Sequence, residues 1–328
     1  MVTASAPGKV YLFGEHAVVY GEPAVPCAVD RRVRVTATGR ADDRVRVTVR
    51  DLSLDGFTAE YDGGLDGSPA VDAPDRLVEA ALAYVEGAVE QGRAVAGTPD
   101  AGFDVEVESD LPLGAGLGSS AAVVVATVAA VAAALGADLD DAALADRAYQ
   151  VERDVQDGQA SRADTFCSTT GGAVRVEGDD CRAIDAPALP ITVGYDGGGG
   201  DTAELVAGVR SLTETYGFAD DTVAAIGDLV ERGLDALDRG DVAELGRLMD
   251  VNHGLLAALG VSARSLDEMV WAAREGGAGG AKLTGAGGGG CVVALDPEGS
   301  ARTALELTPA CEQAFAADLD RRGVRVGD

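Results

Sequence analysis

A glycine-rich loop followed directly by a long apolar run constrains the fold more than any other part of the sequence. Residues 114–120 read GAGLGSS, and residues 121–135 are mostly Ala and Val. This run is too short to cross a bilayer and is typical of a buried helix. We therefore expect a helix that begins near Ser119 and ends at Gly136.

The glycine-rich loop has the properties of a phosphate site. It lies between an alternating segment at residues 103–108 (FDVEVE), which predicts a strand, and the predicted helix. Glycines let backbone amides approach phosphate oxygens, and the helix N-terminus adds free N–H groups and a favourable dipole. Ser119 or Ser120 can offer a hydroxyl to phosphate or to a bound Mg²⁺. A glycine-rich turn that only lets the helix pack closely is the alternative.

Two better-known phosphate motifs do not fit. The Walker motif GxxxxGK[ST] requires a lysine that this loop lacks, and GxGxxG requires glycine where Ser119 stands. A further glycine-rich segment, KLTGAGGGGC at residues 282–291, matches GxGxxG, but the strand-like CVVAL follows it instead of a helix. Its four consecutive glycines favour a backbone that closes tightly over a ligand, with a bulged hairpin as the alternative.

The net charge of −29 limits the partners that the chain can have. A strongly acidic surface repels nucleic acid and anionic lipid, so we expect neither nucleic acid nor a membrane as partner. The 328 residues, 47% of them apolar, suffice for one large or two closely joined globular domains. Five widely spaced cysteines without a CxxC pair, and no charged leader before an apolar stretch, predict a cytoplasmic protein without a zinc site.

Lysine is nearly absent, although acidic residues are abundant. Of the 26 basic residues only Lys9 and Lys282 are lysines, against 55 Asp and Glu. This composition predicts a salt-rich, halophilic cytoplasm, in which screening reduces the repulsion between carboxylates. A GC-rich genome is the alternative explanation.

The same scarcity draws attention to the lysines and histidines that are present. Lys9 and His16 lie in a glycine-containing segment near the N-terminus, Lys282 begins the segment at residues 282–291, and His253 follows Asn252. A lysine at a site of negative charge can bind phosphate or depress a nearby pKa. The alternative is that these rare residues are present by chance and have no function. This explanation is stronger for Lys282 and His253 than for Lys9 and His16.

Local patterns divide the rest of the chain into strands and helices. Residues 51–74 are rich in Gly, Asp and Pro and predict loops or a short hairpin. The segment 179–190 marks the best boundary, between domains at residues 1–185 and 186–328. Antiparallel strand pairs with intervening helices indicate an α+β fold. Further strands are predicted at residues 9–13, 32–38, 44–50, 171–176, 191–195 and 290–295, and helices at 74–89, 140–154 (capped by Asp140), 203–215, 222–238, 241–258, 264–275 and 300–322.

Two carboxylates are candidates for phosphoryl transfer, which requires one near the attacking hydroxyl and another on the metal. Asp164 lies in a predicted loop of small residues, and Glu152 ends the preceding predicted helix. Spacing alone does not select them among 55 acidic residues, most of which are solvated surface acids.

Three glycine-containing segments in this order resemble the superfamily that includes galactokinase, homoserine kinase, mevalonate kinase and phosphomevalonate kinase, the GHMP kinases. The first, APGKVYLFGEHAVVYG at residues 6–21, is most similar to the mevalonate kinases of that superfamily. Residues 112–122 and 282–291 are similar to its phosphate loop and its C-terminal glycine motif. Residues 252–262, NHGLLAALGVS, also resemble mevalonate kinases, so the resemblance spans nearly the whole chain.

The resemblance implies a two-domain α+β GHMP-kinase fold with the active site in the cleft between the domains. The N-terminal domain would be ribosomal protein S5 domain 2-like and the C-terminal domain ferredoxin-like. The implied reaction is ATP-dependent phosphorylation of the C5 hydroxyl of mevalonate, in isoprenoid biosynthesis, with Mg²⁺ as cofactor. The partners are then mevalonate and ATP, and we expect a homodimer.

The resemblance also implies roles at matched positions. Asp164 would be the catalytic aspartate, with Lys9 beside it, and Ser120 and Glu152 would hold Mg²⁺. The substrate would contact Glu15, His16, Thr202, Gly285 and Ala286. The nucleotide phosphates would be bound by Pro112, Gly114, Ala115, Gly116, Leu117, Gly118, Ser119, Ser120, Ala121 and Ala122.

Two segments depart from the family pattern. The family commonly has Gly-x-Pro-Ser-Gly-x-Asp before the catalytic carboxylate, whereas residues 158–164 read GQASRAD. One residue is inserted between Glu152 and Asp164, so Asp154 or Asp157 competes with Glu152 for the metal. Thr202 follows DGGGGD, which carries more glycine and acid than the family leads us to expect.

Three alternative functions remain at this point. Another enzyme of the superfamily would act on phosphomevalonate, diphosphomevalonate, homoserine or a sugar; a phosphorylated substrate would require clustered Arg or Lys beside the motifs, and the sequence has none there. A non-catalytic binding protein on the same scaffold would lack the acid or the lysine, whereas Lys9, Ser120 and Asp164 are all present. A dinucleotide-dependent oxidoreductase is disfavoured by the strand after residue 290.

Overall fold

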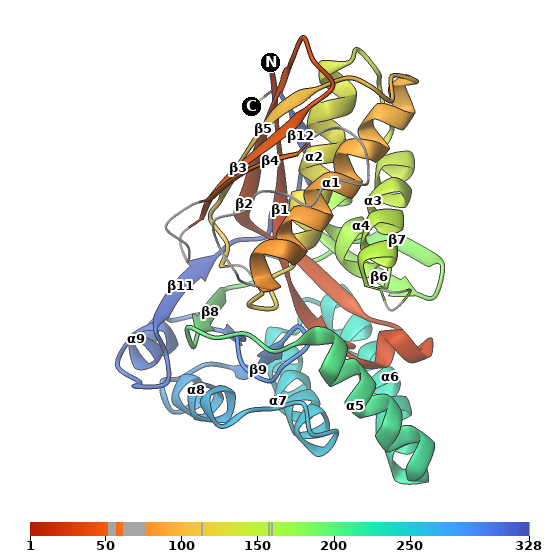
Figure 1. Ribbon diagram of the computed structural model, residues 1–328. Helices are drawn as coiled ribbons and strands as arrows, with labels where there is room; N and C mark the ends of the chain where they lie inside the picture. Colours follow the sequence, from red (N-terminus) through yellow and green to blue (C-terminus); the bar gives the residue numbers. More distant parts are fainter. Residues whose placement is uncertain (52–56, 62–75, 113, 157, 159, 328) are drawn as a thin grey trace.

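Two sheets with helices packed beside them organise the chain (Figure 1). The computed structural model describes residues 1–51, 57–61, 76–112, 114–156, 158 and 160–327. Strands pair antiparallel in both sheets, and the one parallel pair among the described residues joins residues 45–51 to 103–109. The predicted α+β class is confirmed.

The larger sheet is built mainly from the N-terminal half of the chain. In the order in which they lie side by side, its strands are β12 (Arg325–Val326), β1 (Val2–Phe13), β2 (Val25–Gly39), β5 (Phe103–Ser109), β3 (Val45–Asp51) and β4 (Phe57–Tyr61), with β6 (Ala173–Glu177) joined to β2 and β7 (Asp180–Ile184) to β6. The strand predicted at residues 9–13 is the end of the longer β1. Within the predicted loop region 51–74, β4 pairs antiparallel with β3, as the predicted hairpin requires; the rest lies outside the described residues.

The apolar run after the glycine-rich loop forms the central helix α2 (Ser119–Ala134), as predicted. Every residue from Ala121 to Ala132 is buried. The helix contacts β1 and β2 on one side and α1 (Arg76–Ala96), α3 (Asp141–Val155) and α4 (Ala163–Thr170) on the other. Enclosure on all sides explains why α2 is apolar all round, and each fully buried Val contributes about 1.5–3 kcal/mol. Asp140 caps α3 as predicted, because its carboxylate accepts from Ala143 N over 2.8 Å.

The smaller sheet belongs to the C-terminal half. Its four antiparallel strands lie in the order β11 (Gln313–Ala317), β8 (Ile191–Tyr195), β10 (Cys291–Leu295) and β9 (Gly280–Thr284). Between β8 and β9 the chain forms α5 (Thr202–Thr215), α6 (Gly217–Asp238), α7 (Val242–Ala258) and α8 (Arg264–Glu275), and between β10 and β11 it forms α9 (Ser300–Glu306). This is the strand order of a ferredoxin-like fold, in agreement with the expectation.

The helix predicted at residues 300–322 is confirmed at its start, Ser300, and is wrong beyond Glu306. The helix α9 ends at Glu306, and Pro309 follows soon after. Proline donates no backbone hydrogen bond and excludes the residue before it from helical conformation, so the chain leaves the helix and forms β11. The sequence patterns also missed α4, β7, β9 and β12, which are short and depend on packing against distant segments.

The two sheets are connected at more than one place. Residues 185–190 lead from β7 to β8, inside the predicted boundary segment. The last strand, β12, returns to pair with β1, so the two chain ends lie together (Figure 1). The short helix η1 (Ala17–Tyr20) contacts α6. The division into domains at residues 1–185 and 186–328 stays a prediction.

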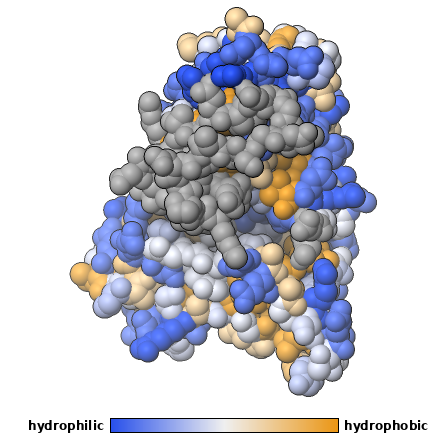
Figure 2. Space-filling model, in the orientation of Figure 1, coloured by the Kyte–Doolittle hydropathy of each residue, from blue (hydrophilic) through white to orange (hydrophobic). Residues whose placement is uncertain are grey.

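Hydrophilic side chains gather at the top and along the upper right edge of the face in Figure 2, whereas its lower half mixes hydrophilic and hydrophobic side chains. Within the ranges that the structure describes, no helix is both long and apolar enough to cross a membrane.

Candidate active site

Lys9 and Tyr11 lie on one face of β1. The register with β2 shifts between Pro7 and Gly8 and again between Tyr11 and Phe13, so neither shift separates the two residues. Residues two apart on a strand point to the same side. Lys9 Nζ accordingly lies 4.4 Å from the centroid of the Tyr11 ring. Both side chains are buried, so their polar atoms must find partners inside the protein.

Asp164 supplies a partner to both. Lys9 Nζ lies 3.1 Å from Asp164 Oδ2, and the Tyr11 hydroxyl donates to Asp164 Oδ1 over 2.8 Å. Asp164 lies in the first turn of α4, so the loop predicted for it is wrong: its small neighbours are compatible with a helix that begins at Ala163. The Asp164 side chain remains 25% exposed, which leaves part of the carboxylate open to a substrate hydroxyl.

The glycine-rich loop enters α2 through three glycines with a left-handed backbone. The φ angle is +69° at Gly114, +84° at Gly116 and +68° at Gly118, values that residues with side chains rarely adopt. Among the described residues no side chain caps α2, so its first N–H groups are available to an anion. Lys9 Nζ also donates to Gly116 O over 3.0 Å, which brings a positive charge to the loop.

The segment at residues 282–291 closes on this loop, backbone against backbone. It turns between β9 and β10, which pair antiparallel. A side-chain carbon at Gly116 would lie 2.5 Å from Thr284 O, and one at Gly290 would lie 2.7 Å from Ala115 O. Glycine at these positions therefore serves the packing of two protein segments, in addition to any contact with a ligand.

Replacing Gly116 by Ala is expected to lower the free energy of unfolding by about 1–2 kcal/mol more than Gly136→Ala does. Gly136 is the matched control, because its φ is +77° and a side-chain carbon there meets nothing within 4 Å. Gly136→Ala thus measures the backbone cost alone, whereas Gly116→Ala adds the collision with Thr284 O. Urea unfolding of both variants measures the difference. Equal losses would contradict the close packing of the loop.

Ser120 and Glu152 meet beside the loop. The Ser120 hydroxyl donates to Glu152 Oε1 over 3.0 Å, and Glu152 is buried. Burial raises the pKa of Glu152 above its usual range and the negative charge of Asp164 raises it further, whereas the Ser120 hydrogen bond and Lys9 lower it. A cation beside this carboxylate would offset the cost of burying its charge. Of its two predicted competitors, Asp154 is exposed, and Asp157 lies outside the described residues.

This pair fits the donor set that Mg²⁺ takes in phosphate sites. No group of three or more His, Cys, Asp or Glu side chains that could hold a metal occurs within the described ranges. Mg²⁺ bound together with a nucleotide needs only one or two carboxylates, because phosphate oxygens and water complete its coordination. The hydroxyl of Ser120 and the carboxylate of Glu152 satisfy that requirement.

Glu15 takes part in a buried ion pair with Lys282. Lys282 Nζ also donates to the Tyr11 carbonyl over 3.4 Å, and Asn252 Nδ2 donates to the second Glu15 oxygen over 3.4 Å. Burial raises the pKa of Glu15 while Lys282 lowers it; burial lowers the pKa of Lys282 while Glu15 raises it. The pair ties the N-terminal motif to β9.

His16, Gly285 and Ala286 lie together next to the glycine-rich loop. His16 Nε2 is 2.8 Å from Ala286 O, and a side-chain carbon at Gly285 would lie 2.5 Å from Gly116 Cα. Burial lowers the pKa of His16, so the neutral ring donates through Nε2. His16 has φ +59° and is the one non-glycine residue with positive φ in the described part of the chain, a strain typical of functional sites.

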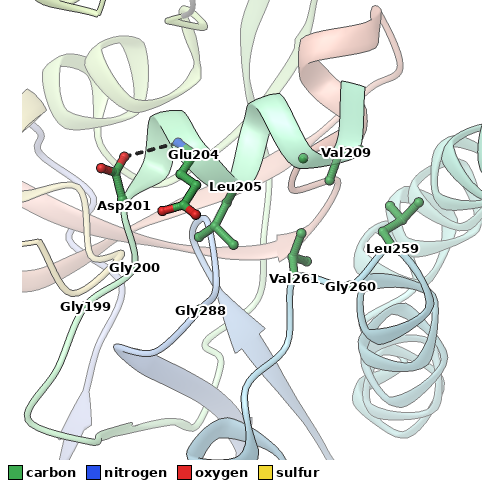
Figure 3. A pocket seen from close by; sticks show the side chains of 11 residues that line it. Gly199, Gly200, Asp201, Glu204, Leu205, Val209, Leu259, Gly260, Val261 and Gly288 are labelled. Carbon is green, nitrogen blue, oxygen red and sulfur yellow. Dashed lines mark hydrogen bonds between the residues drawn. The ribbon is translucent and has the colours of Figure 1, made fainter. Parts of the chain in front are cut away.

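Thr202 is exposed and begins α5, directly after Asp201, which lines a pocket together with Gly288 (Figure 3). The pocket measures about 450 Å³ and has an apolar wall that includes Leu205 and Val261. Asp201 and Glu204 also line it, and Asp201 caps α5 by accepting from Glu204 N over 3.1 Å. An apolar wall with two acids does not suit an anionic substrate, so we assign no ligand to this pocket.

The sequence patterns missed several residues of the site. The rarity of lysine singles out Lys282 but predicts no role for it, and the sequence patterns assign no site role to Tyr11, Thr284 or Asn252. Tyr11 could have been found, because it lies two residues after Lys9 and so shares its face of the strand. His253 is held by two contacts, since it accepts from Leu283 N over 3.3 Å and its Nε2 lies 3.2 Å from Asp267.

Family comparisons match both halves of the chain. The family described as "GHMP kinases N terminal domain" matches residues 83–172, and "GHMP kinases C terminal" matches residues 234–306. A third family, "Galactokinase galactose-binding signature", matches residues 2–38.

Individual relatives match over the full length. The chain is 39% identical over 331 residues to the mevalonate kinase of Thermococcus onnurineus, covering 99% of this chain and 98% of the relative. It is also 39% identical over 331 residues to the mevalonate kinase of Pyrococcus furiosus, with the same coverage. The crystal structure of the Methanococcus jannaschii mevalonate kinase superposes with a TM-score of 0.79 at 28% identity, covering 97% of this chain and 98% of that one.

Proposed function

The chain belongs to the mevalonate kinase family of the GHMP kinases, and from this premise we propose that it transfers the γ-phosphoryl group of ATP to the C5 hydroxyl of mevalonate. It has the two-domain α+β fold of that superfamily. One observation carries the proposal: Lys9 Nζ contacts both Asp164 Oδ2 and Gly116 O, so the acid and the glycine-rich loop lie side by side. Phosphoryl transfer needs such proximity between the acceptor hydroxyl and the phosphates.

Asp164 orients the C5 hydroxyl and accepts its proton. The hydroxyl oxygen forms a bond to the γ-phosphorus while the bond from that phosphorus to the bridging oxygen of ATP breaks, and ADP leaves. Lys9 balances the charge of Asp164 and stabilises negative charge that develops on the transferred group. The N–H groups of the loop and of the first turn of α2 bind the phosphates.

Ser120 and Glu152 would hold Mg²⁺, for which their oxygen donors are suited. When bound, the ion neutralises charge on the ATP phosphates. Glu15, His16, Gly285 and Ala286 support the substrate side, since their contacts join the N-terminal motif to the turn between β9 and β10.

A product assay tests the substrate assignment. The purified protein is incubated with ATP, Mg²⁺ and one compound at a time from a panel of mevalonate, phosphomevalonate, homoserine and galactose. We expect phosphorylation of mevalonate alone, because both lysines that the structure places at the site are already paired, Lys9 with Asp164 and Lys282 with Glu15. Galactose is included because of the galactose-binding signature at residues 2–38. Phosphorylation of another compound in place of mevalonate would contradict the proposal.

The composition and the free cysteines favour a reducing, salt-rich cytoplasm as the place of this reaction. Cys27, Cys167, Cys181, Cys291 and Cys311 are all free, as a reducing cytoplasm favours. We propose a cytoplasmic homodimer that works at high salt, where the net charge of −29 is screened. Running the product assay with and without molar KCl tests the salt requirement: activity should fall without KCl, and unchanged activity would contradict it. Light scattering tests the dimer.

A further inference from the structure

Tyr11 makes a contact for which the proposed mechanism has no role. Its hydroxyl donates to Asp164 Oδ1 over 2.8 Å, while Lys9 Nζ lies 3.1 Å from Oδ2. Each oxygen of the carboxylate is thus held by one side chain of β1. The Lys9 ammonium also lies over the Tyr11 ring, 4.4 Å from its centroid, so the three groups form one cluster.

The Tyr11 hydroxyl acts as a hydrogen-bond donor in this cluster. Burial raises the pKa of Tyr11 well above its ordinary value, and the negative charges of Asp164 and Glu15 raise it further. The phenol therefore keeps its proton and directs it to the carboxylate. Because only 6% of Tyr11 is exposed, water has little access to take its place.

The backbone of Tyr11 is fixed independently of this hydrogen bond. The residue opposite Tyr11 in β2 is Pro26, which has no N–H to donate to the Tyr11 carbonyl. Lys282 Nζ donates to that carbonyl instead, over 3.4 Å, and Tyr11 N donates to Thr284 Oγ1 over 2.8 Å. Both backbone groups of Tyr11 are therefore anchored to β9, at the segment that closes on the glycine-rich loop.

We propose that Tyr11 is a positioning residue that sets the rotation of the Asp164 carboxylate relative to the phosphate loop. A carboxylate rotates freely about its last bond unless both oxygens are held. Lys9 holds one oxygen and Tyr11 the other, and the 25% of Asp164 that stays exposed then faces the acceptor hydroxyl in one orientation. This inference rests on the proposed function, because it assigns Tyr11 a role through Asp164.

Tyr11→Phe is the test, since phenylalanine keeps the ring and its contact with Lys9 and removes only the hydroxyl. We expect kcat for mevalonate phosphorylation to fall about 10- to 100-fold, the effect of losing one hydrogen bond to a charged group. The KM for ATP should stay unchanged, and the thermal unfolding midpoint should fall by only a few degrees, as the loss of one hydrogen bond requires. Tyr149→Phe is the matched control: the Tyr149 ring also lies under a cation, Arg162 at 4.4 Å, and kcat should not change.

A double-mutant cycle separates action through Asp164 from an independent effect. In an Asp164→Asn background, Tyr11→Phe should cause little further loss of the residual rate. Three outcomes would overturn the role of Tyr11 and leave the proposed function standing. In the first, Tyr11→Phe lowers kcat as much in the Asp164→Asn background as in the wild type. In the others, Tyr149→Phe lowers kcat equally, or Tyr11→Phe keeps a near-normal kcat while Asp164→Asn is inactive. Near-normal kcat in Asp164→Asn would instead overturn the proposed mechanism itself.

Discussion

Replacing Asp164 by Asn is expected to lower kcat by about 10³-fold, within the 10²- to 10⁴-fold range of a lost general base. Asparagine keeps the size of the side chain and can still accept from Tyr11, but it can take no proton and forms no ion pair with Lys9. The glycine-rich loop and the Ser120–Glu152 pair remain, so the KM for ATP should stay within a few-fold of the wild-type value. Steady-state kinetics with both substrates varied measures the two constants separately.

Asp154→Asn is the control for this prediction. Asp154 is an exposed acid on the helix that carries Glu152, and it was the rival for the metal in the sequence. We expect its kcat and its Mg²⁺ requirement to match the wild type. Near-normal turnover in Asp164→Asn, or a comparable loss in Asp154→Asn, would show that the acid has been placed at the wrong residue.

Replacing Lys282 by Met is expected to lower the free energy of unfolding by about 3–5 kcal/mol, the cost of leaving one member of a buried ion pair without its partner. Lys282 is 0% exposed and Glu15 is 2% exposed, so no solvent can replace the lost ammonium. The Asn252 amide, at 3.4 Å, is the one other side chain within the described residues that donates to Glu15. Urea unfolding at neutral pH measures the loss.

The double variant Glu15→Gln, Lys282→Met should regain part of the free energy of unfolding that Lys282→Met loses, because it buries no isolated charge. Glu306→Gln is the control, since it breaks an exposed ion pair with Arg302 on α9 and should cost less than about 1 kcal/mol. If Lys282→Met cost no more than Glu306→Gln, the buried pair would not hold the N-terminal motif against β9.

Local patterns predicted the elements whose sequences contain their own signals. The strand at residues 103–108, the glycine-rich loop and α2 follow from an alternating run, left-handed glycines and an apolar run. The cap of α3 by Asp140 follows from a single residue type. The helix predicted at residues 300–322 ends early because Pro309 interrupts the apolar pattern around it.

The candidate site was predictable where rare residue types or motifs marked it. The rarity of lysine marks Lys9, the glycine-rich loop marks Ser120, and the family resemblance selects Asp164 and Glu152; the fold brings the four into two contacting pairs. The partners of Lys282 and Tyr11 were not predictable, because each contact joins residues more than 100 positions apart. The sequence pattern favours a ligand as the reason for the glycines of residues 282–291, with a bulged hairpin as the alternative, whereas the structure uses them to pack one loop against another.

The identity of the product tests the central claim most directly. Mevalonate carries a primary hydroxyl at C5 and a tertiary one at C3, and ³¹P NMR distinguishes their phosphate esters. With ATP, Mg²⁺ and the purified protein in molar KCl, we predict one new phosphomonoester signal, split into a triplet by the two protons on C5, together with ADP. The absence of a new ester, or an unsplit signal from a C3 ester, would contradict the account.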